Sequence, residues 1–177
     1  MIRTASCLVL VVIAVPSIVA FADPIPSSKT IGVDAIGVLP LGDYSDAARF
    51  AIGADGRFEY GISNALVATA RIGYLYHLGI EDGISLGIIP ILVGAKYKIG
   101  TSGLFADAEI GASIFLESGM GESVTNTKLG FQVGAGDQIG KIEVKVGLWM
   151  PGSADFGNGS ESTLYSIMGS VGYDFAL

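Results

Sequence analysis

His77 is the one histidine of the 177-residue chain, and the acids Glu81 and Asp82 follow it closely. A histidine next to a carboxylate can act as a general base in catalysis. The alternative is a histidine that lies partly solvated at the end of a structural element and has no chemical role. The choice between these interpretations depends on the element that carries His77 and on the residues that surround it.

Other segments with chemically suggestive residues lack the spacing that a known site needs. The stretch from Gly134 to Gly140 is rich in glycine, but its spacing is not that of a nucleotide-binding loop, and it does not open a helix. No cluster of His and Cys could hold zinc, and the acids have no recognised calcium-loop spacing. There is no basic stripe for nucleic acid. We therefore predict no metal, no cofactor and no nucleic-acid partner.

The amino-terminal segment has the pattern of a cleaved secretory signal peptide. Arg3 gives a positive start, Cys7 to Val15 is an unbroken apolar core, and Ala20-Phe21-Ala22 precedes the predicted cut. A membrane anchor is the alternative, but Pro16 interrupts the short apolar stretch, whereas a spanning helix needs roughly 20 apolar residues. We predict a signal peptide over residues 1–22, a flexible periplasmic lead over 23–29 and one domain over 30–177.

The composition of the rest of the chain favours β-structure in a membrane. Half of all residues are hydrophobic and the mean hydropathy is +0.58. The longest later apolar run, from Ile84 to Ala95, is too short for a spanning helix and contains Pro90. A closed barrel is the other structure that spans a bilayer, because it pairs every backbone polar group between strands. The 26 glycines and the scarce charges agree with it.

Alternation of polar and apolar residues indicates half-exposed strands. In the segment from Phe50 to Tyr60, the charged residues Asp55, Arg57 and Glu59 share one face if the segment is a strand. Seven more segments alternate similarly, and an even number of strands is typical of bacterial barrels. We therefore predict an all-β, eight-stranded, antiparallel, up-and-down transmembrane β-barrel. Its strands are Thr30–Leu39, Phe50–Tyr60, Leu66–Leu78, Ser85–Ile99, Leu104–Leu116, Thr127–Gln138, Lys141–Met150 and Thr163–Phe175.

The polar face is predicted to point into the lumen. Aromatic residues on the apolar face gather near strand ends, as in the aromatic girdles of membrane barrels. The polar face carries equal numbers of acids and bases, as a narrow lumen requires because unpaired buried charges are costly. A soluble barrel of the lipocalin type would instead hide the apolar face. The predicted inward acids are Asp34, Asp55, Glu59, Asp107, Glu109, Glu143 and Asp174, and the inward bases are Arg57, Arg71, Lys96, Lys98, Lys128, Lys141 and Lys145.

The connections between strands alternate in length. Three are tight and four are mostly longer and more polar, which is the pattern of short periplasmic turns and long external loops. Both termini are then periplasmic. Pro90 cannot donate a backbone hydrogen bond, so we expect a bulge or the start of a strand there. The predicted long loops are Pro40–Arg49, Gly79–Ile84, Glu117–Asn126 and Pro151–Ser162.

The last eight residues, SVGYDFAL, resemble the carboxy-terminal insertion signal of bacterial outer-membrane barrels. Ser170, Gly172, Phe175 and Leu177 occupy its key positions, although the final residue of that signal is more usually aromatic. With the signal peptide and eight strands, the mature chain resembles the small barrel domain of OmpA/OmpX-type proteins. The resemblance implies a Gram-negative outer membrane, contact with its lipid or lipopolysaccharide, recognition by the barrel-insertion machinery, and a monomer.

This resemblance supports a fold and a location more than an activity. We expect a structural or surface-interaction barrel whose lumen is plugged by paired charges. One alternative is a small passive pore, which the narrow interior of eight strands disfavours. Another is a lipid-modifying barrel enzyme; such enzymes use His with Ser and an acid, and in one family of similar size the Ser follows the His by two residues, where this chain has Gly79. A soluble periplasmic barrel remains the last alternative.

Overall fold

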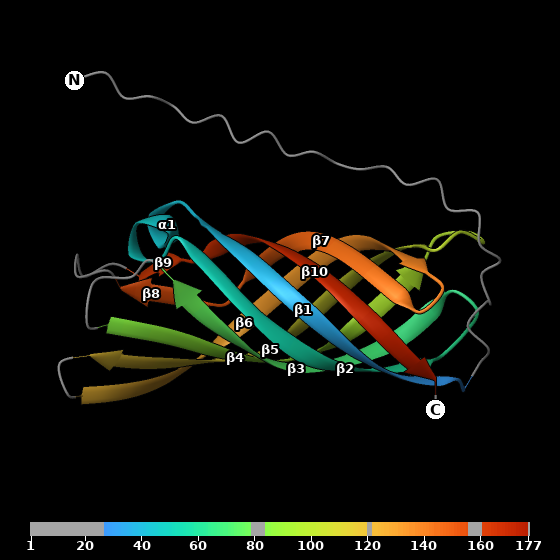
Figure 1. Ribbon diagram of the computed structural model, residues 1–177, viewed down its shortest axis with the longest axis horizontal. Helices are drawn as coiled ribbons and strands as arrows, with labels where there is room; N and C mark the ends of the chain where they lie inside the picture. Colours follow the sequence, from blue (N-terminus) through green and yellow to red (C-terminus); the bar gives the residue numbers. More distant parts are fainter. Residues whose placement is uncertain (1–26, 79–83, 120–121, 156–160, 177) are drawn as a thin grey trace, which may run out of the picture.

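The computed structural model is a closed barrel of eight antiparallel strands, which confirms the predicted fold (Figure 1). It describes residues 27–78, 84–119, 122–155 and 161–176, so the predicted signal peptide, most of the lead and Leu177 lie outside the described residues. Around the barrel the order is β1-β10-β7-β6-β5-β4-β3-β2, and β1 closes the wall against β10. The barrel strands are β1 (Lys29–Leu41), β2 (Phe50–Gly61), β3 (Leu66–Leu78), β4 (Ile84–Lys98), β5 (Leu104–Gly119), β6 (Glu122–Ile139), β7 (Ile142–Met150) and β10 (Tyr165–Ala176).

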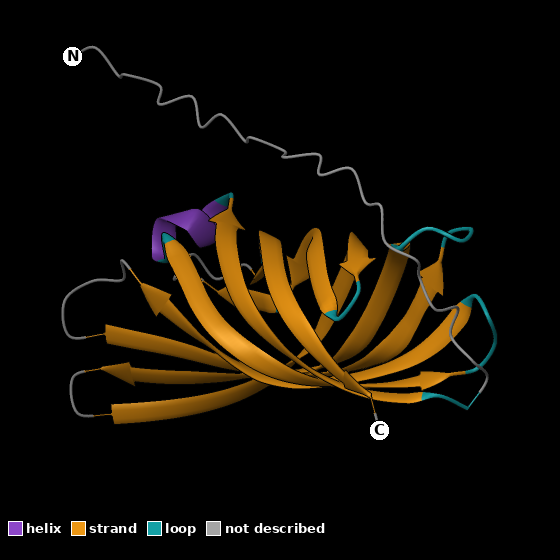
Figure 2. Cartoon of the chain, turned by 45° about the vertical axis from the view of Figure 1, so that its right-hand side comes forward, coloured by secondary structure: helices purple, strands orange, loops and turns teal. Residues whose placement is uncertain are grey.

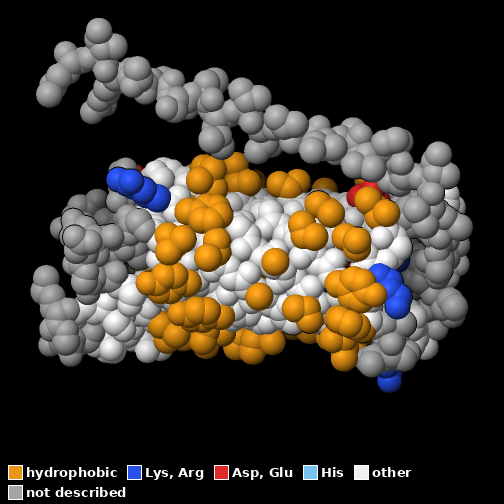
Figure 3. Space-filling view, in the orientation of Figure 1, with side chains coloured by type: hydrophobic (Ala, Val, Ile, Leu, Met, Phe, Trp, Pro, Cys, Tyr) orange, Lys and Arg blue, Asp and Glu red, His pale blue; other side chains and the backbone are white. Residues whose placement is uncertain are grey.

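The outer face of the wall is apolar. On β2, Asp55, Arg57 and Glu59 are buried, whereas Phe58 and Tyr60 are exposed. Because successive side chains of a strand point to opposite faces, a similar alternation runs along the other barrel strands, except at residues 123–127 of β6, which are all exposed. Figure 3 shows hydrophobic side chains over the middle of the wall and the Lys and Arg side chains near its two ends. The inverted, lipocalin-like arrangement of faces is therefore absent from the described strands.

The two ends of the barrel differ in structure. The end near the carboxy-terminus carries short connections, including a two-residue turn at Gly140, whose φ of 64° suits glycine. The opposite end carries α1 (Asp43–Ala47), the purple helix in Figure 2, and a small hairpin of β8 (Ser153–Asp155) and β9 (Glu161–Thr163), which Figure 1 labels. No helix in the described ranges is long and apolar enough to cross a membrane.

One predicted loop is wrong, because most of Glu117–Asn126 forms strands. β5 continues to Gly119 and β6 begins at Glu122, and these two residues pair in the antiparallel register. The segment is polar, which suggested a loop, but Val124 and Thr125 are β-branched and therefore favour strands. The pairing of β6 with β7 stops at Phe131. The part of the β5–β6 hairpin before Phe131 therefore extends beyond the β6–β7 ladder.

The bulge expected at Pro90 is also wrong. β4 pairs with β5 in one register from Ile84 to Lys98, and Pro90 lies opposite Ser113 without a shift. Toward β3, the register is the same on both sides of Pro90, and the two paired stretches are separated by Gly73 and Tyr74. The missing N–H of proline thus interrupts the ladder locally, and no extra residue has to be inserted.

Candidate functional site in the barrel lumen

The lumen contains a charged layer near the short turns and an apolar layer near the long loops. On β1, Asp34 precedes the buried Ile36 and Val38, which lie closer to α1. On β10, whose direction is opposite, the buried Met168 comes before Asp174. Because neighbouring strands are antiparallel, these reversed orders place like residues at the same end of the barrel.

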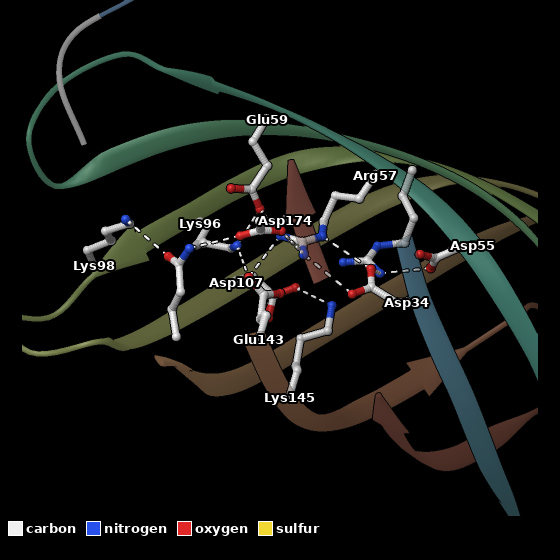
Figure 4. A network of polar contacts seen from close by, with 12 residues as sticks. Asp34, Asp55, Arg57, Glu59, Lys96, Lys98, Asp107, Glu143, Lys145 and Asp174 are labelled. Atoms are coloured by element: carbon white, nitrogen blue, oxygen red, sulfur yellow. Dashed lines mark hydrogen bonds and ion pairs between the residues drawn. The ribbon is translucent and has the colours of Figure 1, made fainter. Parts of the chain in front are cut away.

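Arg57 is the centre of the charged layer. Its Nε lies 3.2 Å from Asp34 Oδ2, its Nη1 lies 2.8 Å from Glu143 Oε2, and its Nη2 lies 2.8 Å from Asp174 Oδ1. Nη1 also pairs with Glu59. These contacts join β2 to β1, β7 and β10 and thus cross the seam where the barrel closes (Figure 4). The rigid fork of guanidinium donors suits such shared binding of several carboxylates.

A second arginine extends the same network toward β5. Arg71 Nη1 lies 2.8 Å from Asp34 Oδ2 and 2.7 Å from Asp55 Oδ2. Its Nε lies 3.3 Å from Glu109 Oε2. Asp34 therefore accepts from both arginines and links the first three strands, while Glu109 joins β5 to the network through Arg71.

Two lysines also form ion pairs in the lumen. Lys96 Nζ pairs with both Glu59 and Glu143 and lies 4.6 Å from the centre of the Phe105 ring. Lys145 Nζ lies 3.0 Å from Asp107 Oδ2. The structure therefore brings Lys96 into the same cluster as Arg57, while Lys145 and Asp107 form a separate pair.

Of the other predicted inward bases, one lies outside the lumen and two are half-buried. Lys141 is exposed in the turn before β7, with its Nζ 5.9 Å from the centre of the Tyr173 ring, so its inward prediction is wrong. Strand parity does not apply inside a turn. Lys98 is half-buried and donates to Gln138 Oε1 at 3.3 Å. Lys128 is half-buried near Gly152, at the end with the long loops.

The predicted equality of inward acids and bases does not hold for the fully buried groups. Among described residues, the buried ionisable groups of the network comprise all seven predicted acids but only four bases, namely Arg57, Arg71, Lys96 and Lys145. The cations are therefore shared: Arg57 contacts four carboxylates, Arg71 three and Lys96 two. Loss of one cation would leave several buried carboxylates without a counter-charge.

His77 lies in the apolar layer and not at a solvated rim. Its side chain is 2% exposed, and its Nε2 is hydrogen-bonded to the hydroxyl of Tyr44, from α1. Burial raises the pKa of Tyr44. Glu81 and Asp82 lie outside the described residues. The apolar layer comprises Ile36, Val38, Tyr44, Ala48, Ala51, Leu75, Ile88, Phe115, Trp149, Leu164 and Met168.

Tyr44 and Ala48 are the lumen residues that strand alternation could not have found. They come from the connection between β1 and β2, where no periodicity says which side chains turn inward. Gln132 could have been found, since it has the inward parity of β6 and its Nε2 lies 3.4 Å from Asp107 Oδ2. No group of three His, Cys, Asp or Glu residues in the described part of the chain could hold a metal ion.

The residues that resemble an insertion signal divide between the two faces of β10. Ser170 is buried and Gly172 faces the lumen, while Phe175 is exposed on the outer wall. A Cβ on Gly172 would overlap Asp34 Oδ1. Gly172 is thus required by the charged layer itself, whatever its part in recognition during insertion.

Replacing this glycine tests the structural requirement. We expect Gly172→Ala to lower the free energy of unfolding by about 1–3 kcal/mol, as overpacking of a filled interior does. The measurement is urea unfolding of the refolded barrel in lipid vesicles, followed by the fluorescence of Trp149, the single tryptophan. Gly169→Ala is the control on the same strand, because its Cβ would meet nothing nearer than Lys145 O at 4.0 Å. Equal stability of both variants would contradict the packing argument.

Comparison with solved structures supports the fold. No protein-family model matches the sequence, and no curated protein matches it. Among solved structures, Neisserial surface protein A (NspA) is similar with a TM-score of 0.57 and 15% identity over 84% of this chain and 97% of that chain. Ail of Yersinia pestis, in complex with a heparin analogue, gives 0.55 and 18% over 84% and 97%. The amino-terminal barrel of Pseudomonas aeruginosa OprF gives 0.52 and 15% over 82% and 97%.

Proposed function

We propose that this protein is a non-conducting outer-membrane barrel with a structural or surface-interaction role. The observation that carries the proposal is a lumen filled by a charged layer and an apolar layer inside an apolar outer wall. Its short turns and termini then face the periplasm. At the other end, α1, the β8–β9 hairpin and the long β5–β6 hairpin face the outside of the cell. Eight strands leave an interior just wide enough for side chains, which agrees with a plug.

The outer wall supports a place in lipid. Its exposed residues are mostly Val, Ile, Leu, Phe and Tyr, and a soluble protein rarely exposes an apolar surface of this extent. The aromatic residues lie toward the two ends of the barrel strands, where membrane barrels carry their girdles. The similar solved structures include barrels whose names place them in outer membranes, and this supports the same location here.

A catalytic role for His77 is not part of the proposal. Its ring is buried, and its Nε2 is already hydrogen-bonded to Tyr44. A general base must reach a substrate proton within hydrogen-bonding distance, and here the Tyr44 side chain, from α1, lies against the ring. We propose instead that His77 and Tyr44 fix α1 over the mouth of the barrel, where the pair joins β3 to the first long connection.

The end of the barrel that carries α1 and the long hairpins offers a surface for contact with other molecules. The extended β5–β6 hairpin exposes Ser118, Ser123, Thr125 and Asn126, whose side chains can donate and accept hydrogen bonds. We propose that lipopolysaccharide surrounds this end, that the barrel-insertion machinery assembles the chain, and that it acts as a monomer.

Planar-bilayer recording tests whether the lumen is closed. We expect the refolded chain to show no steady ion conductance, because both layers fill the narrow interior. A large porin inserted in the same bilayers serves as the positive control. A steady conductance in proportion to the amount of inserted protein would contradict the plugged lumen and favour the small pore.

A further inference from the structure

The barrel wall has a notch where β7 stops pairing with β6. Met150 is the last residue of β7 that pairs with β6, opposite Phe131, while β6 continues toward Glu122. The next residues are Pro151, which has no N–H for the ladder, and Gly152, whose φ of 145° is strained for any other residue. This Pro-Gly pair ends the β6–β7 ladder, and the chain continues into the separate β8–β9 hairpin.

A cavity of about 500 Å³ lies at this notch. Leu129 and Phe131 line it from the outer wall, where Leu129 is 60% exposed. Lys128 also lines it, although its cross-strand partner Ser113 is buried in the lumen. Paired residues of neighbouring strands share a face, so Lys128 has the opposite parity to Leu129. The cavity therefore reaches from the lipid side of the wall toward the mouth of the barrel.

The lining of this cavity is apolar at one end and polar at the other. Leu129, Phe131 and Met150 form the apolar part and continue the outer wall. Lys128, Ser153 and Thr163 form the polar part, and Ser153 and Thr163 are paired across the β8–β9 hairpin. An amphiphile with an apolar chain and an anionic headgroup is complementary to this arrangement, since ammonium and hydroxyl groups both donate to phosphate oxygens.

We propose that the notch binds a phosphorylated acyl lipid of the surrounding outer leaflet. One acyl chain lies against Leu129, Phe131 and Met150, and a headgroup phosphate accepts hydrogen bonds from Lys128. The lipid comes from the leaflet because Leu129 and Phe131 belong to the apolar wall, so a chain reaches the cavity without leaving the bilayer. This inference rests on the proposed outer-membrane location. It adds one specific lipid site to the non-specific lipid contacts of the outer wall.

Native mass spectrometry of the refolded full-length mature barrel tests the site. The probe is diphosphorylated lipid A in mixed micelles, with phosphatidylcholine as the neutral comparison. We expect one lipid A to be retained per barrel, and Lys128→Gln to reduce its retention about tenfold through loss of a charge-assisted hydrogen bond. Lys128→Arg should keep most of the binding. Lys141→Gln, at the exposed lysine beside Tyr173 near the opposite end, is the matched control and should leave retention unchanged.

The outcomes separate this inference from the proposed function. Heat-dependent gel mobility first shows that each variant is a folded barrel, so a loss of binding is not a loss of fold. Equal retention in the chain and in Lys128→Gln, an equal loss in Lys141→Gln, or equal retention of phosphatidylcholine would overturn the lipid site. In those cases a persisting gel shift and membrane fractionation leave the outer-membrane proposal intact. A chain found in the soluble fraction without a gel shift would overturn the outer-membrane proposal itself.

Discussion

The variant Arg57→Met is expected to be the most destabilised, with a loss of about 3–5 kcal/mol in the free energy of unfolding. Methionine keeps much of the side-chain volume but removes a cation that contacts Asp34, Glu59, Glu143 and Asp174. Lys96 still pairs with Glu59 and Glu143, and Arg71 with Asp34, whereas Asp174 keeps only Gln138, at 2.8 Å, among its side-chain partners within the described residues. The expected loss of stability therefore comes mainly from the buried Asp174 carboxylate, which is left without a cation.

Urea unfolding in lipid vesicles, followed by Trp149 fluorescence, measures this loss. The matched control is Arg49→Met, since Arg49 is exposed at the loop end of β2 and a surface substitution changes stability by about 0.5 kcal/mol or less. The double variant Arg57→Met with Asp174→Asn should be more stable than Arg57→Met alone, because neutralising Asp174 removes the unpaired charge. A small effect of Arg57→Met, or no recovery in the double variant, would refute the role of Arg57 as the shared cation.

The second large effect is expected at the outer wall. Val133 pairs with Ala108 on β5 and Leu148 on β7, and its side chain is 46% exposed on the outer face. If this face meets the hydrocarbon core, Val133→Arg should lower the free energy of unfolding in vesicles by about 2–4 kcal/mol, as arginine does near the bilayer midplane. In a soluble barrel the same arginine would be solvated and nearly neutral in effect.

Thr127→Arg is the control on the same strand and the same face. Thr127 is exposed and lies beyond Phe131, the last residue that pairs with β7, so its arginine reaches the interface and should cost about 0–1 kcal/mol. The difference between the two variants measures the depth of the wall in lipid. If both variants are harmless, the wall is not in a membrane. If both are equally harmful, the loss has a cause other than membrane depth.

The strands and their faces could be predicted because alternation is a local property of the chain. Leu66–Leu78 was predicted with the bounds of β3, and Asp55, Arg57 and Glu59 were placed on the buried face of β2. Side-chain direction in a strand follows from position alone, so a register read from the sequence transfers to the structure. Where the chain turns, this rule ends, and the inward placement of Lys141 failed for that reason.

Near the long loops, residue polarity predicted the structure less well than alternation did. The polar residues of Glu117–Asn126 suggested a loop, but their backbone groups pair between β5 and β6. Pro90 suggested a bulge, but one missing donor does not require an extra residue. Both errors arise because backbone hydrogen bonding in a sheet depends on the partner strand, which the pattern of a single strand does not contain.

The sequence by itself determined the eight strands, their inward and outward faces, and the acids and bases available to fill the lumen. Only the tertiary structure decided how those charges are shared, because an ion pair depends on distances between residues such as Arg57 and Asp174, which are far apart in the chain. It also decided that α1 places Tyr44 against His77 and that Pro151-Gly152 opens a notch in the wall. These features require barrel closure, which brings β1 against β10 and gives the lumen its two layers.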